Sequence, residues 1–243
     1  MRKTLSIMAA STLLAIGLGN SALADDLGGA SASEGGEKSG IFVGVHGGVT
    51  LFGLGVYDVN GKKVSDKDVE ATLGVKPSTA SFNVGLKAGY QYFFMPLVGV
   101  RGYLGYDFNG SRSYMKIPNM KDVNVSFQNI TLNADVMVNF LNTDSFTLGA
   151  YVGFGLGYGI TSVTHENKVA QGMIDEMLKE MNYNGFNIPI NVGIAATFAG
   201  SHKVEIGAKI QALSAGYSSK AKNDKSEMLM NTHVINVGYS YIF

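Results

Sequence analysis

Long runs of alternating apolar and polar residues restrict the fold of this chain more than any other feature. In the run 146–160, apolar side chains take every even position, and glycine, threonine or tyrosine takes every odd one. Because successive side chains of a β-strand point to opposite faces, this pattern predicts a strand with one apolar face. The same period recurs in seven further runs, at residues 41–51, 82–94, 98–109, 129–140, 188–198, 204–214 and 233–243. The sequence therefore predicts eight strands.

The lengths of the runs and of the segments between them favour a membrane barrel over a soluble sandwich. Strands of soluble proteins cluster near five or six residues, whereas a tilted strand that crosses a membrane needs about 9–11. The connections alternate between long segments, at 52–80, 110–123, 162–186 and 216–231, and short ones, at 95–96, 142–144 and 199–202. Long loops at one rim and tight turns at the other are typical of outer-membrane barrels. We therefore expect an all-β fold, an eight-stranded antiparallel transmembrane β-barrel with short periplasmic turns and long extracellular loops.

Aromatic residues gather near both ends of the predicted apolar face, where rings tolerate lipid tails and head groups alike. Phe146 and Tyr158 stand near the two ends of one run. At about 3.3 Å per residue and a tilt of about 40°, the segment between them spans about 30 Å, close to the hydrocarbon thickness of a bilayer. The spacing of the aromatic residues thus fits a strand that crosses the membrane.

The first 24 residues have the three parts of a secretory signal peptide. Arg2 and Lys3 form a basic end, an apolar run covers 5–18, and Ala22-Leu23-Ala24 supplies small residues for cleavage after Ala24. The apolar run is too short for a membrane-spanning helix. Residues 25–39, rich in glycine, serine and acid, predict a flexible periplasmic leader. The barrel domain is then expected over 40–243.

The charge composition bears on one class of partner. The formal net charge is +0, so the sequence gives no electrostatic argument for nucleic-acid binding. The chain has no cysteine, which fits an oxidising compartment but also occurs in many cytosolic proteins.

The last run ends in a pattern that resembles the assembly signal of bacterial outer-membrane proteins. The residues that carry it are Asn236, Gly238, Tyr239, Tyr241 and Phe243. In that family the barrel-assembly machinery recognises such a strand by pairing with its exposed edge, so the resemblance implies this machinery as a partner.

Over 40–243 the chain resembles the eight-stranded outer-membrane barrels typified by the transmembrane domain of OmpA and by OmpX. Its glycine and tyrosine content and its Tyr-Ser-Tyr-Ile-Phe ending also resemble Helicobacter-type outer-membrane proteins. The resemblance implies a multi-pass protein in the outer membrane of a Gram-negative cell envelope, in contact with outer-membrane lipid and lipopolysaccharide.

Charged residues of both signs fall on the predicted inner face. They are Lys87, Arg101, Asp107, Asp135, Glu205 and Lys209, with His46 nearby in the first strand. The interior of an eight-stranded barrel is barely wider than its side chains, so buried charges must pair or bring water with them. Two interpretations stay open, a structural plug of ion pairs and a gated, narrow ion path.

The sequence contains no pattern that predicts a catalytic, cofactor or metal site. A deacylase-type site would need a serine two residues after His233, where Ile235 stands instead. His165, Asp175 and Ser162 are residue types that a catalytic site could combine, but their spacing is not diagnostic of one. No cluster has the spacing of metal ligands. We therefore expect a protein that is not an enzyme, with a lipid A-modifying enzyme as an alternative.

The third long connection contains an apolar stripe at helical spacing. Its members are Met173, Ile174, Met177, Leu178 and Met181. Such a face predicts a short helix that lies over the barrel mouth or contacts a host or cell-surface ligand. The expected function is a structural or surface-interaction (adhesion-like) role in the cell envelope, and a narrow pore or ion channel is a further alternative.

Overall fold

Antiparallel strands make up nearly all of the secondary structure that the computed structural model describes, over residues 37–57, 60, 62–68, 78–112, 124–164, 172, 184–213, 219–220 and 227–243. The strands are β1 (Gly40–Tyr57), β2 (Ser78–Met95), β3 (Val98–Arg112), β4 (Asn124–Asn142), β5 (Phe146–Thr164), β6 (Gly185–Phe198), β7 (His202–Leu213), β8 (Ser219–Lys220) and β9 (Glu227–Ile242). No helix within these residues is long and apolar enough to cross a membrane.

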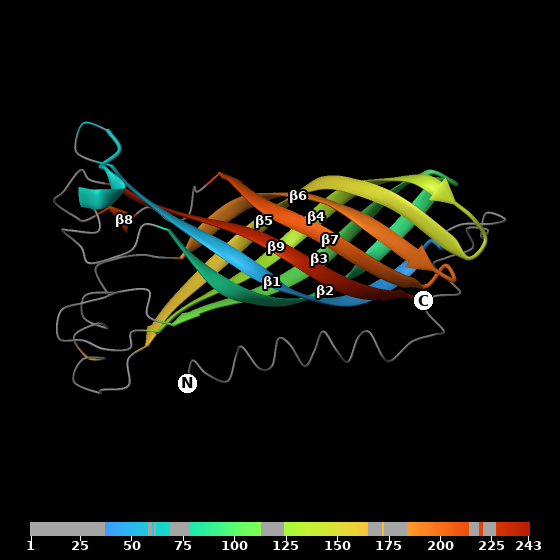
Figure 1. The fold of residues 1–243 in the computed structure, drawn as a ribbon, viewed down its shortest axis with the longest axis horizontal. Coiled ribbons are helices and arrows are strands. Elements are labelled where there is room, and N and C mark those ends of the chain that lie inside the picture. Colours follow the sequence, from blue (N-terminus) through green and yellow to red (C-terminus); the bar gives the residue numbers. More distant parts are fainter. Residues whose placement is uncertain are drawn as a thin grey trace.

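The eight long strands close into a barrel. Each pairs with the next along the chain, β7 pairs with β9, and β9 pairs with β1, from Phe42 opposite Ile242 to Tyr57 opposite Glu227. Figure 1 shows these strands inclined around one continuous wall. The two residues of β8 pair only with the start of β9 and lie outside the closed circuit. The predicted eight-stranded antiparallel barrel is confirmed.

The period of two in the sequence becomes an outward apolar face and an inward polar face. In β5, Val152, Phe154 and Leu156 are each more than half exposed on the outside, whereas Gly155 and Gly157 are buried. Outward aromatic rings meet in pairs near both rims, as Phe146 does with Phe198 at 5.2 Å and Tyr158 with Phe186 at 5.3 Å between ring centroids. An outer surface of this kind suits lipid rather than water.

The short connections 96–97, 143–145 and 199–201 form one rim, named here the short-turn end; the opposite rim is the long-connection end. The chain finishes at the short-turn end, where Ile242 N donates to Ser201 O at 2.8 Å and Phe243 N donates to Ile41 O at 2.9 Å. In the turn between β6 and β7, Ala199 and Gly200 both have positive φ, of 50° and 67°. Two consecutive residues in this region match the twist of a tight hairpin.

Some strand limits differ from the sequence-based expectation. The connection predicted at 216–231 contains β8, and β9 already begins at Glu227, so that prediction was too long. His202, predicted in a turn, opens β7. Polar residues such as Asn231 and Thr232 pair with β1 within the described ladder, although they interrupt the apolar alternation. Backbone pairing therefore extends further than the side-chain pattern.

The predicted signal peptide, residues 1–24, lies outside the described residues, as does the predicted leader up to residue 36. Residues 37–39 are described, and Glu37 is buried inside the barrel.

Candidate functional site

A set of buried charged groups in the barrel interior is centred on Arg101 in β3. Its Nε lies 2.8 Å from Asp135 Oδ2 in β4, directly opposite in the strand register, and its Nη1 lies 2.5 Å from Glu205 Oε1 in β7. Lys87 Nζ in β2 forms an ion pair with the other oxygen of Glu205. Arg101, Asp135 and Glu205 are each at most 3% exposed. Four strands are therefore joined at one level of the lumen.

Two tyrosine rings enclose the guanidinium group. The Cζ of Arg101 lies 5.2 Å from the ring centroid of Tyr103 and 4.3 Å from that of Tyr151, within the range of cation–π contact. The Tyr151 hydroxyl reaches over Gly193 and Gly207, where a Cβ atom would collide with it. These glycines leave room for a tyrosine that fills the lumen beside the charge.

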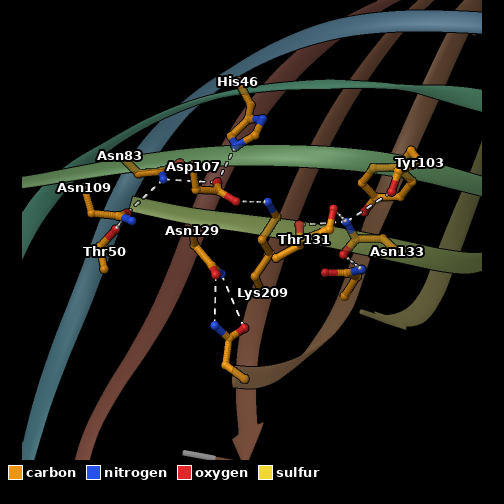
Figure 2. A network of polar contacts seen from close by, with 12 residues as sticks. His46, Thr50, Asn83, Tyr103, Asp107, Asn109, Asn129, Thr131, Asn133 and Lys209 are labelled. Carbon is orange, nitrogen blue, oxygen red and sulfur yellow. Dashed lines mark hydrogen bonds and ion pairs between the residues drawn. The ribbon is translucent and has the colours of Figure 1, made fainter. Parts of the chain in front are cut away.

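A second cluster surrounds Asp107, nearer the long-connection end. Figure 2 shows Asp107 between His46 and Lys209, and the distances from its carboxylate oxygens are 2.7 Å to His46 Nε2 and 2.5 Å to Lys209 Nζ. Asn83 Nδ2 adds a hydrogen bond of 3.2 Å. The carboxylate thus receives partners from three other strands.

Amide side chains fill the lumen around and beyond these ion pairs. Asn129 and Asn187 donate to each other, at 3.4 and 2.9 Å, and Asn191 Nδ2 donates to Asn133 Oδ1 at 3.1 Å (Figure 2). Thr50 donates to Asn109. Each amide offers both donors and acceptors, so a row of them can satisfy buried polar groups without net charge.

A third cluster lies at the short-turn end. Lys203 Nζ forms an ion pair with Glu37 and donates to Gln91 Oε1 at 2.6 Å. Gln91 Nε2 donates to Glu37 Oε1 at 3.1 Å, and Asn139 Nδ2 to Glu37 Oε2 at 3.4 Å. Lys203 and Glu37 were not among the residues predicted from the sequence.

Aromatic and aliphatic side chains occupy the interior at both ends. Phe42, Tyr103 and Ile242 form a buried cluster towards the short-turn end, so the inward Phe42 packs against apolar neighbours. Phe52 and Phe127 meet edge to face on the inside of the long-connection end, with ring centroids 6.5 Å apart and both rings buried.

Two of the cavities between these groups are small. One of about 20 Å³ is lined by His46, Lys87, Tyr151 and Asn191 among others, and one of about 20 Å³ by Asp107, Lys209 and Gln211 among others. One residue lining each cavity has a buried polar atom without a hydrogen-bond partner, Asn191 Oδ1 in the first case and Gln211 Nε2 in the second. Such a volume holds about one water molecule.

The six predicted interior charges therefore lie in two clusters. Lys87, Arg101, Asp135 and Glu205 form one, and Asp107 and Lys209 form the other with His46. Lys203 lies at an odd position of β7, as do Glu205 and Lys209, and odd positions of this strand face inward. Beginning the predicted run one residue earlier would therefore have included Lys203. Glu37 precedes the first strand, and no periodicity indicates its position.

The residues of the predicted assembly signal lie in the last strand and at its end. Asn236 and Gly238 point inward and are buried, whereas Tyr239, Tyr241 and Phe243 are exposed on the outside. Tyr241 and Phe243 stack edge to face at 5.0 Å between ring centroids. The predicted apolar face at Met173, Ile174, Met177, Leu178 and Met181 lies outside the described residues.

The three described histidines each contact a different partner. His46 contacts Asp107, His202 Nδ1 lies 2.7 Å from the Tyr239 hydroxyl, and Gln211 N donates to His233 Nδ1 at 3.3 Å. No group of three or more potential ligands could hold a metal ion within these residues. His165 and Asp175 fall outside them.

Comparison with known proteins gives one family and a set of distant folds. The family model for Helicobacter outer membrane protein matches residues 85–243. No curated protein matches the sequence.

The solved structures similar to this chain include three outer-membrane proteins. Neisserial surface protein A has 14% identity and a TM-score of 0.40, with 85% of this chain and 100% of that chain covered. OprG from Pseudomonas aeruginosa has 12% identity and a TM-score of 0.42, with 86% of this chain and 99% of that chain covered. The outer membrane protease OmpT from Escherichia coli has 9% identity and a TM-score of 0.43, with 88% of this chain and 99% of that chain covered.

Proposed function

Because the chain belongs to the Helicobacter outer membrane protein family, we propose that it is a sealed, non-enzymatic barrel with a structural or surface-interaction role in the cell envelope. In outer-membrane barrels the short turns face the periplasm and the long loops face the outside. The short-turn end is then periplasmic, and the long-connection end presents its segments at the cell surface.

The observation that carries the proposal is the set of ion pairs that crosses the lumen. In the closed order of eight long strands, β3 and β7 lie opposite each other. Arg101 in β3 binds Glu205 in β7, and Asp107 in β3 binds Lys209 in β7. Two bridges across the full width of the interior obstruct a continuous aqueous path. A sealed barrel of this kind anchors in the membrane the long segments at its outer rim.

The surface role can be tested on the apolar face predicted in the third long connection. Replacing Met173, Ile174 and Met177 together by serine should abolish binding of protein-bearing vesicles to cultured epithelial cells, while heat-modifiable migration of the barrel persists. The matched control is Glu176→Gln with Lys179→Gln, which changes two residues on the opposite face of the same predicted helix and keeps the net charge. Binding that survives the serine variant would count against a surface contact through this face.

The proposed absence of catalysis has its own test. A deletion strain should show lipid A with unchanged acylation by mass spectrometry, since the described histidines have no serine or metal partner that would make a hydrolytic site. A change in acylation that the restored gene reverses would favour the enzyme.

A narrow channel is the second candidate, and the two water-sized cavities beside the ion pairs favour it. A residue lining each cavity has an unpartnered polar atom, and Lys209 lines both cavities, so waters in the two would join if Lys209 separated from Asp107. Both carboxylate oxygens of Asp107 are engaged, which favours the sealed state.

A further inference from the structure

Glu37 lies outside the barrel strands in sequence and inside the barrel in space. Only 6% of its surface is exposed, although it precedes β1 and belongs to a stretch rich in glycine, serine and charge. A carboxylate that is removed from water needs hydrogen-bonding partners to offset the loss of solvation. Its surroundings supply three.

The partners converge from three separate strands. Lys203 of β7 and Gln91 of β2 both reach Oε1, and Asn139 of β4 reaches Oε2 at 3.4 Å. All three side chains are themselves at most 4% exposed, and all three present N–H groups to the carboxylate. One ammonium and two amide donors around two oxygens make a carboxylate-binding site built into the barrel wall.

The charges of the described barrel interior also require this carboxylate. The strands contribute the four cations Lys87, Arg101, Lys203 and Lys209, but the three anions Asp107, Asp135 and Glu205. Four against three leaves one positive charge, and Glu37 supplies the fourth anion directly at Lys203. A buried cation without a counter-charge is strongly destabilising.

Lys38 and Ser39, which follow Glu37, are bound across the same opening through backbone and side-chain atoms. Gln91 Nε2 donates to Lys38 O at 2.6 Å, Phe93 N donates to Ser39 Oγ at 2.9 Å, and Lys38 Nζ donates to Ser201 Oγ at 3.1 Å. These contacts attach the segment to the end of β2 and to the turn at 199–201. The segment therefore spans from one side of the short-turn end to another.

We propose that residues 37–39 form a latch that closes the periplasmic mouth, with the Glu37 carboxylate as the ligand of a site made by Lys203, Gln91 and Asn139. Water and solutes reach the lumen from the periplasm only when this carboxylate leaves its site. The inference rests on the proposed sealed barrel, but its test reports on the periplasmic mouth alone, whereas ion conduction reports on the whole lumen.

The absence of native cysteine allows a clean accessibility test in the full-length protein in vesicles or detergent. Met137 points inward between the levels of Asp135 and Asn139, and its Sδ lies 3.8 Å from Lys203 Nζ. A Met137→Cys variant should react slowly with a charged, water-soluble thiol reagent. Adding Glu37→Gln should raise the rate about tenfold or more, the change expected from the loss of one charged hydrogen bond.

Two controls separate opening of the mouth from general loosening of the barrel. Asp144→Asn removes an exposed carboxylate from a turn at the same end and should leave the Met137→Cys rate unchanged. Thr50→Cys, buried towards the opposite end, should stay slow in the presence of Glu37→Gln. Equal Met137→Cys rates with and without Glu37→Gln, or a parent cysteine that already reacts freely, would overturn the latch.

Chemical rescue tests the identity of the ligand. Glu37→Ala removes the carboxylate and leaves space for a small acid, so acetate at high concentration should slow labelling of Met137→Cys in this background. Acetamide, which has the same shape without the charge, should not. Equal protection by both compounds, or by neither, would contradict a carboxylate site.

Discussion

Arg101 connects several walls of the barrel interior. It binds carboxylates from β4 and β7 and lies between two tyrosine rings, with 3% of its surface exposed. Its planar guanidinium suits this position, because it can engage two carboxylates in its plane and two rings across its faces. A lysine would keep the charge and lose this geometry.

Removal of this guanidinium should destabilise the barrel strongly. Arg101→Met leaves Asp135 and Glu205 with one buried partner fewer, and we expect a loss of about 3 kcal/mol in the free energy of unfolding. Urea titration in lipid vesicles, followed by the gel shift of the folded form, measures it. Lys63→Met, in an exposed ion pair with Asp66, is the control and should change stability by at most about 0.5 kcal/mol. An Arg101→Met variant as stable as the parent would contradict a structural role for the cluster.

Single residues also show where prediction from sequence ends. Arg101 and Asp135 could be predicted as interior charges because they share the inward parity of their strands, and the register brings them opposite each other. The bridge from Arg101 to Glu205 depends on barrel closure, which no local pattern encodes. Glu37 could not be predicted, because a residue outside the alternating runs carries no information about which face it occupies.

At the scale of single strands, glycine sets how much of the lumen the opposite side chains can fill. A Cβ at Gly207 in β7 would collide with the Tyr151 hydroxyl and come within 3.3 Å of Val192 O. The high glycine content of the sequence thus has a steric use on the inner face, where large polar groups need space.

The steric role of Gly207 predicts a compensating pair of substitutions. Gly207→Ala should lower the free energy of unfolding by about 1–3 kcal/mol through overpacking. Tyr151→Phe removes the colliding oxygen, so the double variant should recover part of the loss relative to the two single changes. Additive losses of unfolding free energy in urea titrations of all three variants would show that the two side chains do not collide.

The turn between β6 and β7 gives a prediction in the stabilising direction. Ala199 has a φ of 50° and an exposed side chain, and a Cβ in this region costs about 1 kcal/mol. Ala199→Gly should therefore raise the free energy of unfolding by roughly that amount, whereas Ala88→Gly inside β2 should lower it. For each variant, a rise or a fall in the midpoint temperature of the gel shift shows whether the free energy of unfolding has increased or decreased.

Strand limits were predicted less well than strand existence. The alternation located all eight long strands, but β1 and β9 extend beyond their apolar runs, to Tyr57 and back to Glu227. Hydrogen bonding between strands continues wherever two backbones run side by side, whether or not the side chains alternate. Sequence periodicity therefore identifies the lipid-facing part of a strand and underestimates its full length.

In the whole molecule, the pairing of β1 with β9 closes the barrel, and the polar clusters fill the lumen that this closure encloses. Every long strand has two neighbours, so the barrel has no unpaired long edge, and the interior polar clusters tie opposite walls to each other. Such a structure should resist detergent. Without boiling, the purified protein should migrate on a denaturing gel at a position different from that of the boiled sample, and an unshifted band would argue against a closed barrel.

Ion conduction tests the sealed interior most directly. In planar bilayers, the purified protein should give no steady unit conductance, because two ion pairs, Arg101 with Glu205 and Asp107 with Lys209, bridge opposite strands across the lumen. A steady unit conductance that disappears when the protein is heat-denatured before reconstitution would contradict the sealed barrel and establish a channel instead.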